Sequence, residues 1–465
     1  MRYALRLPIN SGVFSRIYRW PDKTVSIAYH TPSRSASTLE GDSAEVWWRL
    51  FQSGGATDSA LDYMLAHGEF STDAREEAIA TLAAFGQSLE ASNLIEGPRN
   101  QGPTCGPTAG VADLASPQRN IEQAIGQMMG DHRVCYSLTL ETTYRCNERC
   151  VHCYLPDETH LNELTLDQID RLFGEFDALG GFSLGLTGGE VGVRKDFADI
   201  LDLARKYGFL TGILSNLTRF SDAMLARIIE HQPKSVSCSI YSADPALHDG
   251  VTRLEGSFHR SLRAIETLRE GGVTVAIKTP LMKHTAAGWR EVEALAERLG
   301  CGFQMDLSIT AKNDGGLAPL GQRVEDFATL KDVFSSPLYR ITIMNEPLGV
   351  AHQGPDLTAS LCGAGAAGLV VSPDGTVRPC IGMTEALGQF PTESLSDIWQ
   401  GAPFFQRWAA LTLADVPCGQ CANFRTCSRC PGAWHAEHGS YTQPTEYNCF
   451  LAHAWSGASR QGSVS

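Results

Sequence analysis

The sequence lacks both a membrane-spanning run and a surplus of basic residues. No stretch approaches the roughly 18 consecutive apolar residues that a transmembrane helix requires. The first residues, MRYALRLPIN, contain no apolar core followed by a small-residue cleavage site, so we expect a cytoplasmic protein with no membrane partner. Lys and Arg number 38 against 52 Asp and Glu, a net charge of -14, without a long basic run. This balance argues against nucleic acid as the main partner.

Cysteine, by contrast, is plentiful, with 14 residues. Without an export signal a disulfide framework is not expected, and metal binding or redox chemistry explains the content better. The segment RCNERCVHCYL holds three of them, Cys146, Cys150 and Cys153. The C-terminal quarter holds seven more: Cys362, Cys380, Cys418, Cys421, Cys427, Cys430 and Cys449. The remaining four are isolated, and we interpret them as small buried apolar residues or plain loop thiols: Cys105, Cys135, Cys238 and Cys301.

Residues 1–97 predict a small α+β module. Strands are expected near 3–8, 13–20 and 24–29, and helices near 42–52, 57–67 and 72–93. Residues 98–133 follow, and the aperiodic, Gly/Pro-rich EGPRNQGPTCGPTAG, residues 96–110, covers their beginning. We expect this stretch to be a linker or surface loop.

From residue 134 to 340, strand and helix patterns alternate. Six short apolar runs are each followed by an amphipathic stretch; the runs lie at 136–141, 182–187, 209–214, 235–240, 273–278 and 303–308. Successive β/α units predict a parallel sheet covered by helices. Six units rather than eight predict an α/β fold of the partial (β/α)6 TIM-barrel type. Ligands gather at the carboxyl ends of such strands, and the three close cysteines directly follow the first one.

Three clustered cysteines admit two interpretations. A structural zinc site normally takes four protein ligands, and a fourth would have to be His152, wedged between two of the others. A cubane iron–sulfur cluster held by three thiolates instead leaves one iron open to an exogenous ligand. The pattern favours the cluster, with zinc as the alternative.

The Cys-x3-Cys-x2-Cys loop, followed by the aromatic Tyr154, resembles the signature of the radical S-adenosylmethionine (SAM) superfamily. The resemblance implies a 4Fe-4S cluster on Cys146, Cys150 and Cys153 whose open iron binds SAM. It also implies reductive cleavage of SAM to a 5'-deoxyadenosyl radical, which abstracts a hydrogen atom from the substrate.

Further segments resemble the SAM-contacting elements of that family. LTGGE resembles its Gly-Gly-Glu element, and LSNLT and SIYSADPALHDGVTRLEGSF resemble its third and fourth strand ends. Glycines there let the main chain approach a ligand closely. The resemblance implies cofactor contacts from Gly188, Gly189, Glu190, Ser215, Asn216, Ser239, Arg253 and, at the end of the fifth strand, Lys278.

Residues 341–465 resemble the SPASM extension, which holds two auxiliary 4Fe-4S clusters. The resemblance assigns Cys418, Cys421, Cys427 and Cys449 to an outer cluster, and Cys362, Cys380 and Cys430 to an inner one. The family has three residues between the last cysteine pair of CGQCANFRTCSRC, whereas this chain has two. The inner cluster then lacks a fourth cysteine. A zinc ribbon is the alternative, although the central spacer is short for one.

Residues 1–97 resemble the winged-helix recognition element of ribosomally made, post-translationally modified peptides (RiPPs). The resemblance implies that this module binds the leader of a precursor peptide, for which an exposed sheet edge would suit. Of Trp47 and Trp48, at least one is expected in the core. A DNA-binding winged helix is the alternative.

Together the resemblances predict a radical SAM peptide maturase that forms a crosslink, either a thioether or a carbon–carbon bond, and draws electrons from a donor such as flavodoxin or ferredoxin. Asp306 and Asp314 are candidates for a base toward the substrate, with structural hydrogen bonding as the alternative role. Sulfatase-maturase-like formylglycine formation and peptide epimerisation are the other reactions to be distinguished.

Overall fold

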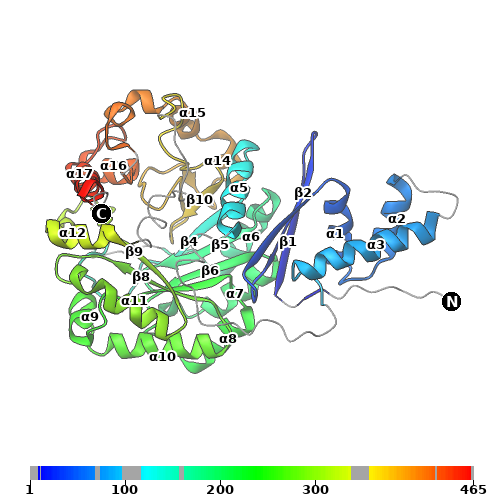
Figure 1. The fold of residues 1–465 in the computed structure, drawn as a ribbon, viewed down its shortest axis with the longest axis horizontal. Helices are drawn as coiled ribbons and strands as arrows, with labels where there is room; N and C mark the ends of the chain where they lie inside the picture. The colour runs from blue at the N-terminus through cyan, green and yellow to red at the C-terminus, as the bar shows by residue number, and fades with distance from the viewer. Residues whose placement is uncertain are drawn as a thin grey trace.

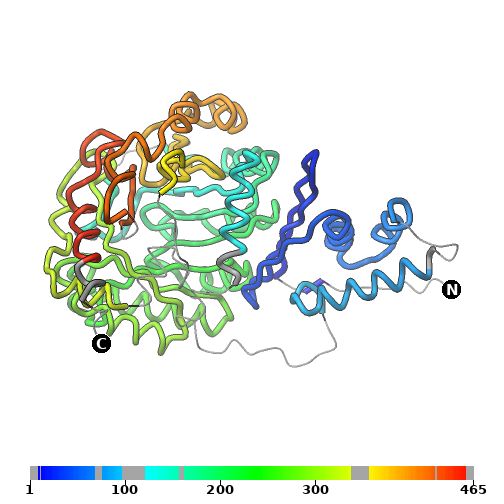
Figure 2. The backbone as a smooth tube through the Cα atoms, turned by 45° about the horizontal axis from the view of Figure 1, so that its top comes forward, coloured from blue at the N-terminus to red at the C-terminus, as the bar shows by residue number. Residues whose placement is uncertain are grey.

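The computed structural model describes residues 9–10, 12–68, 74–96, 117–156, 162–336, 355–424 and 427–461. An N-terminal unit lies at one end of a central sheet covered by helices, and the C-terminal region runs along one side of that sheet, with the last helix of the chain away from the N-terminal unit (Figures 1 and 2). No helix among these residues is long and apolar enough to cross a membrane.

The N-terminal unit contains an antiparallel sheet in the order β1-β2-β3. Its strands are Val13–Arg19, Thr24–His30 and Ser35–Glu40, and its helices are α1 (Asp42–Gln52), α2 (Asp58–His67) and α3 (Ala74–Ala91). The predicted strand at 3–8 lies outside the described residues. The third strand instead has the sequence SASTLE, which carries little apolar alternation; its pairing with β2 over six residue pairs makes it a strand.

Both faces of this small sheet are covered. On one face the helices bury Trp47, which is 0% exposed and donates its indole N–H to Ser15 Oγ (2.9 Å), so one of the tryptophan pair lies in the core as expected. On the other face Tyr18 and Ile27 share an apolar cluster with Phe182 and Leu210, which lie at the amino ends of two central strands. The N-terminal unit therefore packs on the end of the central sheet away from the cysteine loop.

The segment predicted as a linker contains a helix. This helix, α5 (Pro117–Asp131), contributes Ile125 and Met129 to the same apolar cluster. The Gly/Pro-rich part of the predicted linker, up to residue 116, lies outside the described residues. The interface is also polar, since Tyr18 donates its hydroxyl to the Gly180 carbonyl oxygen (2.9 Å).

The six predicted strands form a parallel sheet in chain order, confirming the α/β expectation. The strands are β4 (Ser137–Thr143), β5 (Ser183–Gly188), β6 (Leu210–Ser215), β7 (Ser235–Ser239), β8 (Val275–Pro280) and β9 (Gly302–Asp306). The helices that cover them are α6 (Leu166–Ala178), α7 (Phe197–Lys206), α8 (Asp222–His231), α9 (Pro245–Thr252), α10 (Ser257–Glu270), α11 (Trp289–Arg298) and α12 (Phe327–Ser335). Helix α6 illustrates why these segments are helical. A capping box at Thr165 satisfies backbone amides of its first turn, and its apolar face is buried against the sheet.

The C-terminal region extends this sheet. Strands β10 (Gly368–Val371), β11 (Thr376–Arg378) and β12 (Gly388–Gln389) continue it beyond β4, so that this sheet has nine strands among the described residues. Strand β10 runs parallel to β4 and antiparallel to β11. The helices of the region are α14 (Leu395–Gly401), α15 (Pro403–Ala409), α16 (Pro431–His438) and α17 (Glu446–Gln461). The strands of residues 137–306 and those of the C-terminal region thus belong to one sheet (Figure 1).

Candidate functional site

The loop carrying the three clustered cysteines, residues 145–153 (the cysteine loop), begins directly after β4. Two glycines let the end of β5 lie against it: the Gly189 amide donates to the Thr143 carbonyl oxygen (2.7 Å). A Cβ on Gly188, where φ is +132°, would lie 2.2 Å from Thr143 O, and one on Gly189 would lie 2.5 Å from Arg145 O. Only glycine fits such contacts with a neighbouring backbone.

Glu190 ties the next strand to this arrangement. Its carboxylate is 0% exposed and accepts hydrogen bonds from Ser215 Oγ (2.7 Å) and the Asn216 amide (2.7 Å) at the end of β6. Burial raises the pKa of Glu190, and these hydrogen bonds oppose the rise. Asn216 in turn places its side-chain amide 3.9 Å from Cys146 Sγ. Residues predicted from two separate motifs are therefore joined by hydrogen bonds, and one of them, Asn216, lies beside the first cysteine.

The far side of the cysteine loop rests on α9. The loop amides of Arg149 and Val151 donate to the carbonyl oxygens of Thr252 (3.0 Å) and Val251 (3.1 Å) at the end of α9. Arg253, the next residue, has a left-handed φ of +56° and an exposed side chain. The structure thus places Arg253 next to the loop.

Thiolates are the usual ligands of an iron–sulfur cluster, but among the described residues no three His, Cys, Asp or Glu side chains are grouped so that they could hold a metal ion as they stand, so cluster binding by this loop stays a prediction. The three thiols come from one short loop, and burial raises the pKa of Cys146 to about 11 and also raises that of Cys150. Cys150 lies 3.7 Å from the Tyr241 hydroxyl. Burial lowers the pKa of His152 to about 4, and its Nδ1 has no hydrogen-bond partner, so this imidazole is neutral. Metal binding here must displace the protons of half-buried thiols.

The remaining predicted residues lie at strand ends, with one exception. Ser239 ends β7 opposite Lys278 of β8, and Asp306 ends β9, so all three lie at the carboxyl edge of the sheet. Burial lowers the pKa of Lys278, and the charge of Asp306 opposes this. Asp314 is exposed and accepts the Gly316 amide (3.0 Å) within its own turn, and no contact joins it to Asp306 in the described structure.

The C-terminal cysteines separate into the two predicted sets. Four line one small cavity: Cys418, Cys421, Cys427 and Cys449. In the other set, Cys380 and Cys430 lie near enough to Cys362 to raise its pKa further, after burial. Cys301 is buried, 2% exposed, and directs its thiol to the Leu299 carbonyl oxygen. Among the described residues, the inner set therefore gains no fourth cysteine.

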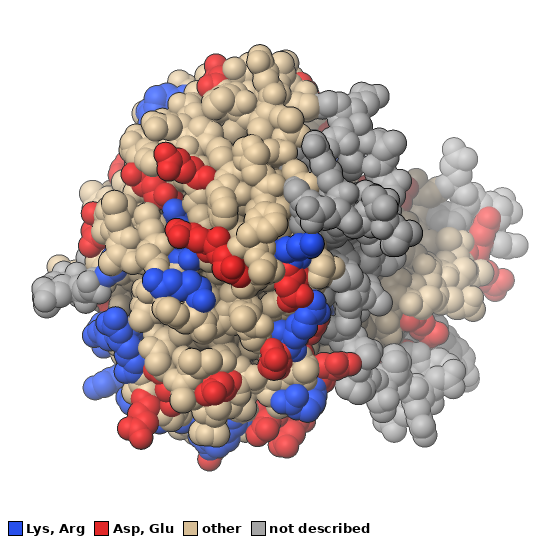
Figure 3. All heavy atoms as spheres, turned by 60° about the vertical axis from the view of Figure 1, so that its left-hand side comes forward, with Lys and Arg blue, Asp and Glu red and all other residues tan. Residues whose placement is uncertain are grey.

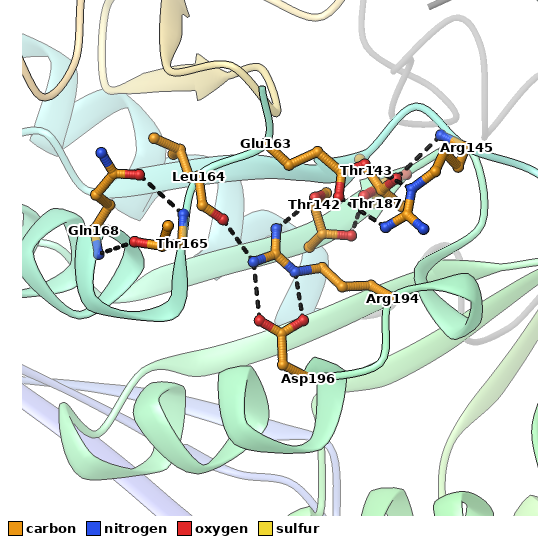
Figure 4. Close-up of polar contacts among 10 residues, drawn as sticks. All are labelled: Thr142, Thr143, Arg145, Glu163, Leu164, Thr165, Gln168, Thr187, Arg194 and Asp196. Atoms are coloured by element: carbon orange, nitrogen blue, oxygen red, sulfur yellow. Dashed lines mark hydrogen bonds and ion pairs between the residues drawn. The ribbon is translucent and has the colours of Figure 1, made fainter. Parts of the chain in front are cut away.

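A buried arginine that the sequence motifs did not identify binds the backbone just before the cysteine loop. The Arg194 side chain, 5% exposed, forms a bidentate ion pair with Asp196 and donates to the carbonyl oxygens of Thr142 (2.9 Å) and Leu164 (2.6 Å) (Figure 4). It thereby fixes the end of β4 to the segment that begins α6. An Arg four residues after a Gly-Gly-Glu motif was the only sequence signal.

Glu163 also binds the backbone segment that leads from β4 into the cysteine loop, through the side chains of Thr143 and Arg145. Its carboxylate accepts two hydrogen bonds from Arg145 (3.0 and 2.8 Å) and one from the Thr143 hydroxyl (Figure 4). Arg145 directly precedes Cys146, so the first residue of the cysteine loop is held by its side chain.

Two family models match the chain where these sites lie. Residues 140–299 match the Radical SAM superfamily, and residues 362–431 match SPASM, an iron–sulfur cluster-binding domain. The mycofactocin maturase MftC of Mycobacterium ulcerans is 27% identical over 309 residues, which cover 64% of this chain and 82% of that protein. An AdoMet-dependent heme synthase of Oleidesulfovibrio alaskensis is 24% identical over 333 residues, covering 66% of this chain and 85% of that protein.

Solved structures share the fold at low sequence identity. Streptococcus suis SuiB bound to precursor peptide SuiA has a TM-score of 0.61 at 14% identity, covering 96% of this chain and 100% of that chain. The structure of anSMEcpe with bound AdoMet has a TM-score of 0.54 at 16% identity, covering 70% of this chain and 93% of that chain.

Proposed function

Because the chain joins a radical SAM domain to an iron–sulfur cluster-binding domain and is therefore a radical SAM enzyme, we propose that it modifies a ribosomally made precursor peptide. Residues 1–97 bind the leader, residues 98–133 connect, residues 134–340 hold SAM, and residues 341–465 hold two auxiliary clusters. The product is an intramolecular crosslink in the core peptide.

One observation carries the proposal: the N-terminal unit is part of the fold shared with SuiB. SuiB, solved with its precursor peptide, covers 96% of this chain, whereas anSMEcpe covers 70%. In the described residues β1 and β3 are both edge strands that pair with β2 alone, and in this proposal β3 is the edge that accepts an extended peptide. Main-chain hydrogen bonds along that edge supply affinity for a leader. The acidic chain does not favour the DNA-binding alternative. On the face drawn in Figure 3, which is turned away from the N-terminal unit, basic and acidic side chains are interspersed.

The residues of the carboxyl edge have distinct tasks in this proposal. When bound, the cluster on Cys146, Cys150 and Cys153 and its SAM supply the 5'-deoxyadenosyl radical. Gly188 and Gly189 present their main chain to the amino group of SAM, and Glu190 fixes the neighbouring strand end by its buried hydrogen bonds. The remaining SAM contacts come from Ser215, Asn216, Ser239, Arg253 and Lys278.

Asp306 is the stronger candidate for a base. It ends β9 near Lys278, and its charge raises the pKa of Cys430 as well, after burial and the charge of Cys380. The carboxylate therefore lies between the radical SAM edge and the inner cysteine set. Asp314, exposed in its own turn, stays a prediction that no contact supports.

The outer cysteine set suits electron exchange with a separate protein. Cys421 and Cys449 are exposed, so a cluster on this set lies at the surface. Crosslinking removes two hydrogen atoms from the peptide, and the auxiliary clusters accept the electron that hydrogen-atom abstraction leaves behind. A flavodoxin or ferredoxin supplies the electron for SAM cleavage.

Thioether and carbon–carbon crosslinks both satisfy this arrangement. A thioether is favoured by the inner set, because three cysteines leave an iron able to take the substrate thiolate. Epimerisation involves no net oxidation and gives the auxiliary clusters no electron to accept. Formylglycine formation of the sulfatase-maturase type gives the N-terminal unit no task.

The test is anaerobic coexpression with a short precursor encoded beside the gene, followed by mass spectrometry. Loss of two hydrogen atoms per crosslink is expected, whereas epimerisation would leave the mass unchanged. The same core without its leader should be modified at least about tenfold more slowly, because β3 no longer contributes affinity. Hydrogen exchange with the full precursor should slow the β3 amides but not those of β1. Equal modification of the leaderless core would refute leader binding.

A further inference from the structure

The end of β4 carries a buried carboxylate to which the proposed function gives no role. Glu141 is 0% exposed, and a carboxylate is almost never fully buried without a partner. Its partner is Arg378, 3% exposed, whose Nη2 donates to Glu141 Oε2. Glu141 belongs to the radical SAM domain and Arg378 to the cluster-binding domain. The ion pair therefore joins the two domains inside the protein.

The sheet register explains how the two residues meet. Thr139 of β4 pairs with Val370 of β10, and Val370 pairs with Arg378 of β11. Cross-strand partners share a face of the sheet, and so do residues two apart on one strand. Glu141, two residues beyond Thr139, thus lies on the same face as Arg378. Addition of β10 and β11 to the sheet is what creates the pair.

The same carboxylate holds both ends of the cysteine loop. Tyr144, just before the loop, donates its hydroxyl to Glu141 Oε2 (2.7 Å), and Tyr154, just after it, donates to Oε1 (3.0 Å). Arg378 also donates to the Tyr144 hydroxyl (3.4 Å). The residues that flank the cysteine loop on either side are therefore fixed at one buried point.

Arg378 is itself tied to the inner cysteine set. It lies two residues before Cys380, and its Nη1 donates to the Met383 carbonyl oxygen (3.4 Å). The segment that carries Cys380 therefore directly follows the strand whose last residue, Arg378, binds Glu141.

We propose that Glu141 is a positioning residue that, clamped by Arg378, holds the cysteine loop in the geometry that binds SAM. The geometry of the SAM site then depends on the cluster-binding domain being docked on the sheet. Removing the arginine leaves a carboxylate in the interior with no cation, and the loop ends that it holds shift with it. This inference concerns SAM binding and does not require the precursor peptide.

The test uses the full chain, reconstituted anaerobically, with SAM affinity and the change in the EPR spectrum of the reduced protein on SAM addition as readouts. Arg378→Met should weaken SAM binding about tenfold or more while iron content stays at the wild-type level, as expected when a partner of a ligand-bearing loop is lost. Glu141→Gln/Arg378→Met removes the unpaired charge, so thermal stability should recover while SAM binding stays weak.

Arg323→Met is the matched control. Arg323 and Glu437 form another ion pair between the same two domains, with side chains 11% and 7% exposed, and in the described structure the hydrogen bonds of Arg323 go to Glu437 and to the Ile309 carbonyl oxygen rather than to the cysteine loop. It should lower thermal stability and leave SAM affinity unchanged. Wild-type SAM affinity in Arg378→Met, or an equal loss in Arg323→Met, overturns the proposal. Should Arg378→Met fail to take up iron, Tyr154→Phe decides, because it deletes one hydrogen bond to Glu141: a weaker SAM affinity supports the proposal, and an unchanged one refutes it.

Discussion

Gly188→Ala tests the close approach of β5 to the cysteine loop. The added Cβ would lie 2.2 Å from Thr143 O, a backbone atom, and φ at this position is +132°. A residue forced into this glycine region costs about 1–3 kcal/mol, and overpacking costs about 1–3 kcal/mol more. We therefore expect about 4 kcal/mol less free energy of unfolding. At about 3 °C per kcal/mol for a domain of this size, the melting temperature should fall by about 12 °C.

Gly208→Ala is the control, measured beside it by calorimetry. Gly208 also has a positive φ, +69°, but a Cβ added there would meet nothing within 4 Å. Only the left-handed backbone cost of about 1–2 kcal/mol applies, so its melting temperature should fall by about 4 °C. Equal melting temperatures for the two variants would show that β5 does not press on Thr143.

Three further predictions concern other parts of the chain. Glu190→Gln places an amide N–H₂ among the donors that its buried carboxylate satisfies, and should cost about 2–3 kcal/mol and weaken SAM binding in calorimetric titration. His231 is 4% exposed, and burial lowers its pKa to about 4. Because the imidazole of the unfolded chain takes up a proton at a higher pH than the buried one, protonation favours unfolding. The free energy of unfolding should therefore fall by about 3 kcal/mol as the pH falls from about 6.5 to 4. His231→Asn should flatten that loss in acid unfolding curves. Replacing both Cys418 and Cys421 by Ala leaves two thiols in the outer set, fewer than the three of each other set, and should reduce the iron content by about a third; a full complement would show that the outer set holds no cluster.

Local patterns carried most of the fold. Each central strand is a short apolar run bounded by turn residues, and each covering helix has an apolar face, so both are legible within about ten residues. The cysteine spacing and the Gly-Gly-Glu motif are equally local, and the structure brings Gly189, Glu190 and Asn216 to the loop as predicted. Their roles as cofactor contacts stay predictions.

The elements that local sequence patterns did not predict are polar, short or dependent on partners distant in the chain. SASTLE becomes a strand only because β2 offers it a neighbour, and α5 interrupts a predicted linker because the N-terminal sheet and the central strands together bury its apolar side. The sequence alone determined the repeating units and the chemistry of the cysteine motifs, since periodicity and spacing act over a few residues. Only the tertiary structure decided that β10 and β11 join β4 and so bring Arg378 to Glu141, because that pairing links positions 237 residues apart.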